Sequence, residues 1–138
     1  MVYKSEHRHA RCGKILIVED NRSCFRVAAD FLRHHGHTVY HSATGMDIFD
    51  IIQENRPDLI LMDIQLREVL GTELIRYIKA KDEIRSIPIV ATTACDMRGD
   101  EERILESGCD GYLAKPIGLH ALLAMVNRLL SIRPTRER

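Results

Sequence analysis

Five short segments of strand-like composition alternate along the chain with longer segments of helical period. The strand-like segments cover residues 15–18, 38–41, 59–62, 89–92 and 112–114. Those at 15–18 and 59–62 are wholly apolar, which is typical of strands buried on both faces of a sheet. Strands that alternate with helices predict a parallel sheet covered by helices on both faces. The expected fold class is therefore α/β, a three-layer, doubly wound domain.

The intervening segments carry apolar residues at helical spacing. The stripes run from Phe25 to Leu32, from Ile48 to Ile52, from Leu74 to Ile78 and from Leu119 to Leu130. A further helix is expected with the acidic residues 100–102 on its first turn, where negative charge is favourable. Gly36 and Gly108 are expected to end two of the helices, because glycine readily adopts the left-handed conformation that follows a helix.

Length and charge predict one domain with basic ends. A chain of 138 residues that is 45% hydrophobic can build a single core. Lys plus Arg equals Asp plus Glu at 20 each, which argues against a protein built mainly to coat nucleic acid. The ends carry +3 (1–14) and +2 (131–138), so the body carries −5. We expect a flexible basic, His-containing extension at 1–13, the domain at 14–132 and a flexible basic tail at 133–138.

The cysteines and apolar runs indicate a cytoplasmic protein. Cys12, Cys24, Cys95 and Cys109 include no CxxC pair, so we interpret them as reduced thiols. The apolar run 121–126 has six residues, whereas a membrane helix needs about twenty. We therefore expect no membrane insertion.

Polar residues that suit phosphoryl chemistry follow four of the expected strands. Glu19 and Asp20 follow the first strand, Asp63 the third, Thr93 the fourth and Lys115 the fifth. Ligands of such sheets bind beyond the carboxyl ends of the strands, so these side chains are expected to converge there. Three neighbouring carboxylates repel one another, and Mg²⁺, which prefers oxygen ligands, would relieve that repulsion.

A carboxylate beside Mg²⁺, a lysine and a threonine can support phosphoryl transfer. An aspartate can attack phosphorus to give an aspartyl phosphate. The metal, the Lys115 ammonium and the Thr93 hydroxyl would then each stabilise one phosphoryl oxygen. Thr92 competes with Thr93 for this role.

Five motifs in order carry a family resemblance. They are the segments 15–21 and 58–63, Gly71, Thr93-Ala94 and Lys115-Pro116. With these motifs, residues 14–130 resemble the receiver domain of two-component response regulators. Residues 61–66 and 99–103 also look like the matching segments of single-domain cell-cycle regulators within this family.

The resemblance implies a CheY-like, flavodoxin-like sandwich with strand order 2-1-3-4-5, and it implies site roles. Asp63 would be the phosphoacceptor. Asp20, Asp63, Glu19 (partly through water) and the backbone carbonyl of Gln65 would hold Mg²⁺. Lys115 would pair with the phosphoryl group, and its bond to Pro116 would be cis.

The resemblance also implies partners and a switch. Phosphoryl groups would come from a histidine kinase or a histidine phosphotransfer protein. Thr93 and Tyr112 would then move and change the surface formed by the fourth helix, the fifth strand and the fifth helix, which would contact a downstream protein target. Hydrolysis would be slow and self-catalysed, so the protein would be a switch and not a true enzyme. No helix-turn-helix module follows the tail, so no typical DNA-binding domain is expected.

One departure keeps alternatives open. Receivers usually carry proline four residues after the phosphoacceptor, where this chain has Arg67. Loss of a fixed φ should loosen that loop, and a scaffold that acts without phosphorylation is one alternative. A Mg²⁺-dependent phosphohydrolase is another, although Gln65 stands where such an enzyme needs an acid.

Overall fold

The computed structural model describes residues 12–94 and 98–132, and its strands form one parallel sheet. The strands are β1 (Lys14–Val18), β2 (Thr38–Ser42), β3 (Leu59–Asp63), β4 (Ile89–Thr93) and β5 (Gly111–Ala114). Their order is β2-β1-β3-β4-β5, and all four neighbouring pairs are parallel. The doubly wound fold and the strand order 2-1-3-4-5 are thus confirmed.

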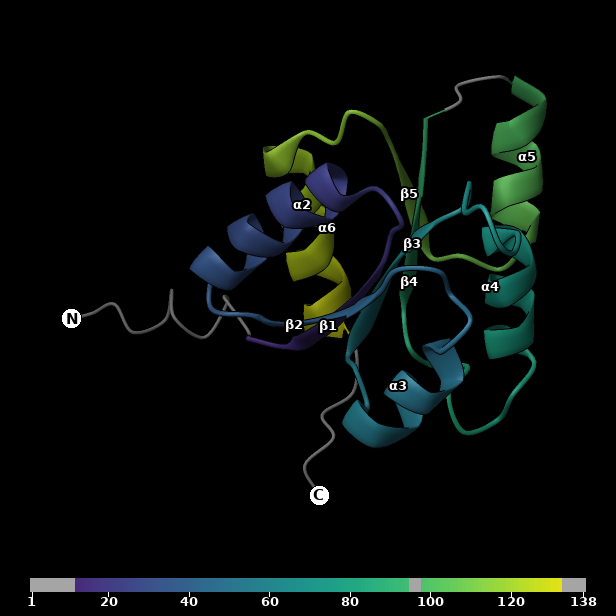
Figure 1. Cartoon of the computed structure of the whole chain (residues 1–138), viewed down its shortest axis with the longest axis horizontal. Coiled ribbons are helices and arrows are strands. Elements are labelled where there is room, and N and C mark those ends of the chain that lie inside the picture. Colours follow the sequence, from purple (N-terminus) through teal and green to yellow (C-terminus); the bar gives the residue numbers. More distant parts are fainter. Residues whose placement is uncertain (1–11, 95–97, 133–138) are drawn as a thin grey trace.

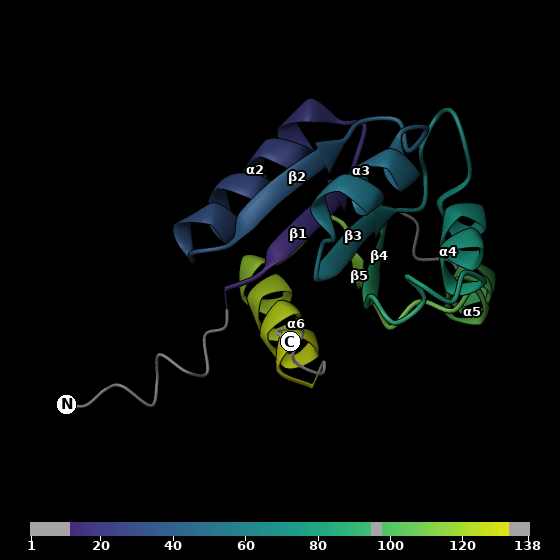
Figure 2. The same cartoon turned by 90° about the horizontal axis from the view of Figure 1, so that it is seen from below.

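Helices cover both faces of the sheet, as Figures 1 and 2 show. They are α2 (Arg22–His34), α3 (Ile48–Asn55), α4 (Gly71–Lys79), α5 (Arg98–Glu106) and α6 (Leu119–Ile132). In Figure 1, α2 and α6 lie on one side, and α3, α4 and α5 lie on the other. No helix in the described part of the chain is both long and apolar enough to cross a membrane. The parts of the expected extension and tail at 1–11 and 133–138 lie outside the described residues.

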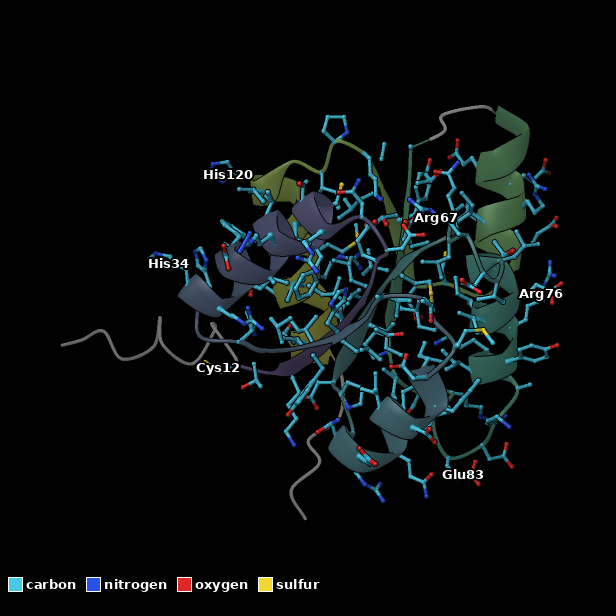
Figure 3. The ribbon with its side chains drawn as sticks, in the orientation of Figure 1. Cys12, His34, Arg67, Arg76, Glu83 and His120 are labelled. Carbon is cyan, nitrogen blue, oxygen red and sulfur yellow. The ribbon has the colours of Figure 1, made fainter. Side chains whose placement is uncertain are left out.

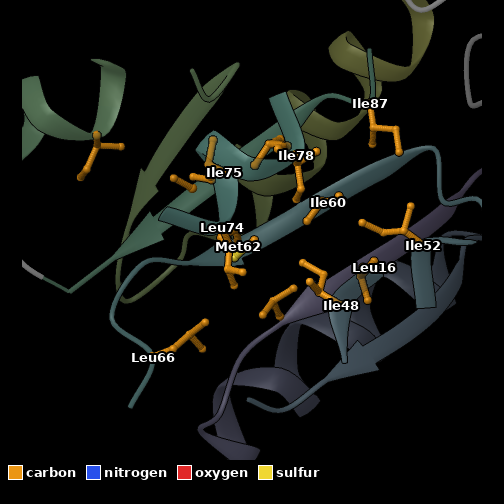
Figure 4. Close-up of a cluster of buried hydrophobic side chains, with 14 residues drawn as sticks. Leu16, Ile48, Ile52, Ile60, Met62, Leu66, Leu74, Ile75, Ile78 and Ile87 are labelled. Carbon is orange, nitrogen blue, oxygen red and sulfur yellow. The ribbon is translucent and has the colours of Figure 1, made fainter. Parts of the chain in front are cut away.

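The strands contribute side chains to two hydrophobic cores, because successive side chains of a strand point to opposite faces of the sheet. Ile15 and Ile17 of β1 pack in one core with residues of α2 and α6. Leu16 and Val18 pack in the other core with residues of α3 and α4 (Figure 4). Burial of one such side chain contributes about 1.5–3 kcal/mol. The apolar runs of β1, β3 and β4 are thereby explained, since each strand serves both cores.

Helix ends follow local rules that the sequence largely predicts. Asn21 caps α2, because its side chain accepts a 2.9 Å hydrogen bond from the Cys24 N–H. Gly36 and Gly108 follow α2 and α5 with φ of 94° and 104°. After α3, Arg56 adopts the left-handed conformation with φ 51°, because the proline that follows it disfavours a helical conformation.

His37, between α2 and β2, makes stability depend on pH. Its Nδ1 accepts a 3.1 Å hydrogen bond from the Gly13 N–H. Burial lowers the pKa of His37 below the ordinary value of 6.5, and nearby His35 lowers it further. His37 is therefore protonated more readily in the unfolded chain than in the folded chain. Protonation favours the unfolded chain, so stability falls as the pH falls through about 6.5.

Urea unfolding at about pH 7.5 and about pH 5.5 tests this effect. We expect His37→Asn, which keeps an acceptor, to lose less stability on acidification than the wild type. Exposed His120 provides the control, since His120→Asn should behave like the wild type. Equal acid losses in His37→Asn and the wild type would contradict this assignment.

Candidate functional site

Three carboxylates meet at the carboxyl ends of β1 and β3. Glu19 and Asp20 directly follow β1, and Asp63 ends β3. The two strands are neighbours, with Val18 opposite Met62. One oxygen from each carboxylate lies within 4.8 Å of the others. The structure therefore brings together the acidic residues that the strand-end argument selects.

Lys115 provides a positive charge among these acids. It follows β5, and its Nζ donates to Glu19 Oε1 at 2.7 Å and to Asp63 Oδ2 at 3.3 Å. Its side chain is 16% exposed, against 6% for Glu19 and 3% for Asp63. The Lys115–Pro116 peptide bond is cis, the isomer that the resemblance implies. The Lys115 ammonium group thus contacts two buried carboxylates, and the third, Asp20, lies beside them and is partly exposed.

The pKa values reflect this excess of negative charge. Burial raises the pKa of Glu19 above 4.5, and the charge of Asp63 adds to this, although the Lys115 hydrogen bond opposes it. Burial alone would lower the pKa of Lys115, but its contacts with Glu19 and Asp63 outweigh burial and raise it. Lys115 therefore stays charged, while the ionised form of Glu19 remains incompletely compensated.

The Asp63 carboxylate is held at both oxygens. Oδ1 accepts a 2.9 Å hydrogen bond from the Gln65 N–H, and Oδ2 faces Lys115. The Gln65 side chain reaches across to the next loop, where its Oε1 accepts from the Ala94 N–H at 2.8 Å. Gln65 therefore links the loop after β3 with the loop after β4. A metal bond from its carbonyl remains a prediction.

Gly71, one of the family motifs, sits against the backbone of the site. A Cβ atom at this position would lie 2.4 Å from Ile64 Cα and 2.6 Å from the carbonyl oxygen of Asp63. Real Cβ atoms do not approach other atoms so closely. Gly71 is therefore required because α4 starts in direct contact with the end of β3.

His41 supports the site, and sequence reasoning did not select it. It lies in β2, and its Nε2 donates to the Glu19 carbonyl oxygen at 2.9 Å. The imidazole stacks on Phe25 with ring centroids 3.7 Å apart. Its place near the carboxyl end of the second strand was the available signal, because the other site residues follow that rule.

The residues expected to move on phosphorylation lie at the carboxyl end of β4 and in β5. Thr92 and Thr93 are both buried, at 2% and 1% exposure, so the choice between them stays a prediction. The pKa of Tyr112 is raised, chiefly by its interaction with the Glu101 carboxylate of α5. Tyr112 therefore connects β5 to α5, and its movement on phosphorylation remains a prediction.

Comparisons with known proteins agree on one family. The family model described as response regulator receiver domain matches residues 15–127. The polar-differentiation response regulator DivK of Brucella anthropi is 41% identical over 84% of this chain and 94% of its own length. This similarity confirms the narrower resemblance to single-domain cell-cycle regulators.

Solved receiver structures share the fold. The signal receiver domain of a histidine kinase from Syntrophus aciditrophicus has a TM-score of 0.83 at 32% identity, covering 92% of this chain and 98% of that one. The receiver domain of a sensor histidine kinase from Pseudomonas aeruginosa has a TM-score of 0.80 at 35% identity, covering 88% and 99%. That receiver domain has a magnesium ion coordinated in its active site cleft. The acidic cluster, the parallel sheet and these similarities together show that the chain belongs to the response regulator receiver domain family.

Proposed function

We propose that this chain is a phosphorylation-controlled signalling switch whose phosphoacceptor is Asp63. The observation that carries the proposal is the environment of its carboxylate. It is 3% exposed, it is oriented by the Gln65 N–H and Lys115, and it lies beside Glu19 and Asp20. Receiver domains are signalling modules and not a classical enzyme family, so we propose at most slow self-catalysed gain and loss of the phosphoryl group.

The donor set fits Mg²⁺. Glu19, Asp20 and Asp63 offer only oxygen ligands, and their charge exceeds that of Lys115. A hard cation with a preference for carboxylates and water suits such a cluster. We propose that these three carboxylates and the Gln65 carbonyl hold the ion, which when bound would neutralise charge on the phosphoryl oxygens.

The reaction that these residues support is transfer from a phosphohistidine. An Asp63 carboxylate oxygen attacks phosphorus, the new P–O bond forms, and the P–N bond to the histidine of a kinase or phosphotransfer protein breaks. Lys115 stabilises charge on one phosphoryl oxygen, and the Thr93 hydroxyl donates to another. The protein otherwise contributes positioning, since Asp63 is already held at both oxygens.

The output would pass through the face formed by α5, β5 and α6. The Lys115 N–H donates to the Thr93 carbonyl oxygen at 2.7 Å, so β4 and β5 meet beside the phosphoacceptor. Movement of Thr93 and Tyr112 would alter this face and its contact with a downstream protein target. We propose the domain boundaries 14–132 and action in the cytoplasm, which the free thiols of Cys12, Cys24 and Cys109 support.

Acetyl phosphate and Mg²⁺ test the proposed phosphoacceptor directly. Intact-mass measurement should show one added phosphate on the wild type and none on Asp63→Asn. The matched control is Asp50→Asn, which changes an exposed aspartate in α3 and should label normally. An unmodified wild type, or a phosphate that is still added to Asp63→Asn, would contradict the proposal. If the protein were instead a scaffold that acts without phosphorylation, the wild type and Asp63→Asn would bind the partner protein with equal affinity.

A further inference from the structure

Arg67 makes a contact with the acidic cluster that proline cannot make. Its main-chain N–H donates to Asp20 Oδ2 at 3.1 Å, across 47 positions of sequence. Proline has no N–H, so this hydrogen bond exists because the chain departs from the usual family residue here. We propose that Arg67 is a positioning residue whose main-chain N–H orients the Asp20 carboxylate for the divalent cation. The inference rests on the proposed magnesium site.

The side chain of Arg67 contributes little to this role. Its Nε lies 4.0 Å from Asp20 Oδ2, and the side chain is 87% exposed. Figure 3 shows Arg67 in the loop that leads into α4. Exposed ion pairs of this kind contribute little, whereas an N–H that donates to a carboxylate makes a stronger, charge-assisted bond. The positioning therefore comes from the backbone, and any residue except proline can supply it.

The same loop holds a second carboxylate in the same way. The Gln65 N–H binds Asp63 Oδ1 at 2.9 Å, and two residues later the Arg67 N–H binds Asp20. The loop is closed by the Gly71 N–H, which donates to the Ile64 carbonyl oxygen at 3.3 Å. The loop between β3 and α4 thus presents two main-chain donors to two carboxylates of the cluster. Loosening of this loop, expected from the loss of proline, is opposed by the added contact with Asp20.

A held carboxylate should bind metal better than a free one. Oδ2 of Asp20 accepts the N–H, and a carboxylate has further acceptor positions for a cation. Hydrogen bonds that orient metal-ligating groups typically change metal affinity by about 10–100-fold when they are removed. Because Asp20 is partly exposed, we expect an effect at the lower end of this range.

Magnesium titration by calorimetry separates the backbone from the side chain. Arg67→Ala keeps the N–H, so its Mg²⁺ dissociation constant should stay within about twofold of the wild type. Arg67→Pro removes the N–H and should bind Mg²⁺ about tenfold more weakly. Arg76→Ala, at an exposed arginine of α4 (Figure 3), is the control and should bind like the wild type. Equal affinity of Arg67→Pro and Arg67→Ala would overturn the inference.

Amide hydrogen exchange, measured without metal, tests the contact independently and does not depend on the Arg67→Pro variant. The Arg67 amide should exchange more slowly in the wild type than in Asp20→Ala, with the Glu68 amide as the internal reference. Equal exchange of the Arg67 amide in both proteins would overturn the positioning contact. A wild type that binds no Mg²⁺ would overturn the proposed metal site, and the positioning role with it. If the wild type binds Mg²⁺ but Arg67→Pro binds it with the same affinity, the positioning role alone would be overturned.

Discussion

Replacement of Lys115 by methionine is expected to slow phosphorylation of Asp63 about a hundredfold or more. The variant loses the ammonium that contacts both Glu19 and Asp63, so two buried carboxylates remain without a cation. Breaking a buried ion pair costs about 3–5 kcal/mol, and because Lys115 is partly exposed we expect about 2 kcal/mol at neutral pH. Lys115→Met should therefore lower both the phosphorylation rate and the free energy of unfolding.

The stability loss in Lys115→Met should depend on pH in a defined direction. Burial already raises the pKa of Glu19, and without Lys115 it should rise further. The folded variant then retains protons that the unfolded chain releases above about pH 4.5, so its deficit relative to the wild type grows as the pH rises. Urea unfolding at about pH 5 and about pH 7 measures the difference, and a deficit that shrinks toward neutral pH would contradict the assignment.

Lys79 offers a matched control for this experiment. It is a lysine of similar exposure, at 20%, and its Nζ binds Asp110 at 3.0 Å, outside the acidic cluster. Lys79→Met should therefore lower stability while leaving the rate of acetyl phosphate labelling unchanged. If both lysine variants slowed labelling equally, the loss in Lys115→Met would reflect damaged folding instead of lost charge stabilisation.

Gly71→Ala is expected to lower the free energy of unfolding by about 3 kcal/mol. The added Cβ would lie 2.4 Å from Ile64 Cα and 2.6 Å from the Asp63 carbonyl oxygen, and both atoms belong to the backbone. Neither can rotate away, so α4 or the end of β3 must shift. Because Asp63 lies at that end, labelling by acetyl phosphate should also slow, by about tenfold.

Gly118→Ala is the control for the glycine experiment. A Cβ at Gly118 meets only the Ala121 Cβ, at 3.9 Å, which is ordinary contact. Alanine also reduces the freedom of the unfolded chain, so stability should change by less than about 1 kcal/mol. Urea unfolding and labelling of both variants measure the contrast. Similar behaviour of Gly71→Ala and Gly118→Ala would show that the close approach at Gly71 does not constrain the site.

The elements of the fold were predictable because their signals are local. The apolar runs at 15–18 and 59–62 lie within β1 and β3, since a strand buried on both faces needs continuous apolar residues. Helix ends near Gly36 and Gly108 follow from the conformational freedom of glycine. Such rules depend on neighbours in sequence, so they can be applied before any tertiary contact is known.

The positions of the acidic residues and Lys115 were also predictable, because in a parallel sheet the carboxyl ends of the strands meet at one edge. Three contacts of the site were not: His41 with the Glu19 carbonyl, Gln65 with the Ala94 N–H, and the Arg67 N–H with Asp20. Each uses a main-chain carbonyl, which every residue carries, or a main-chain N–H, which every residue except proline carries, so the sequence does not show which partner such a group will meet. The sequence alone determined the order of elements and the residue types at the strand ends. Only the tertiary structure decided which backbone groups orient them, because that depends on distances between loops that lie far apart along the chain.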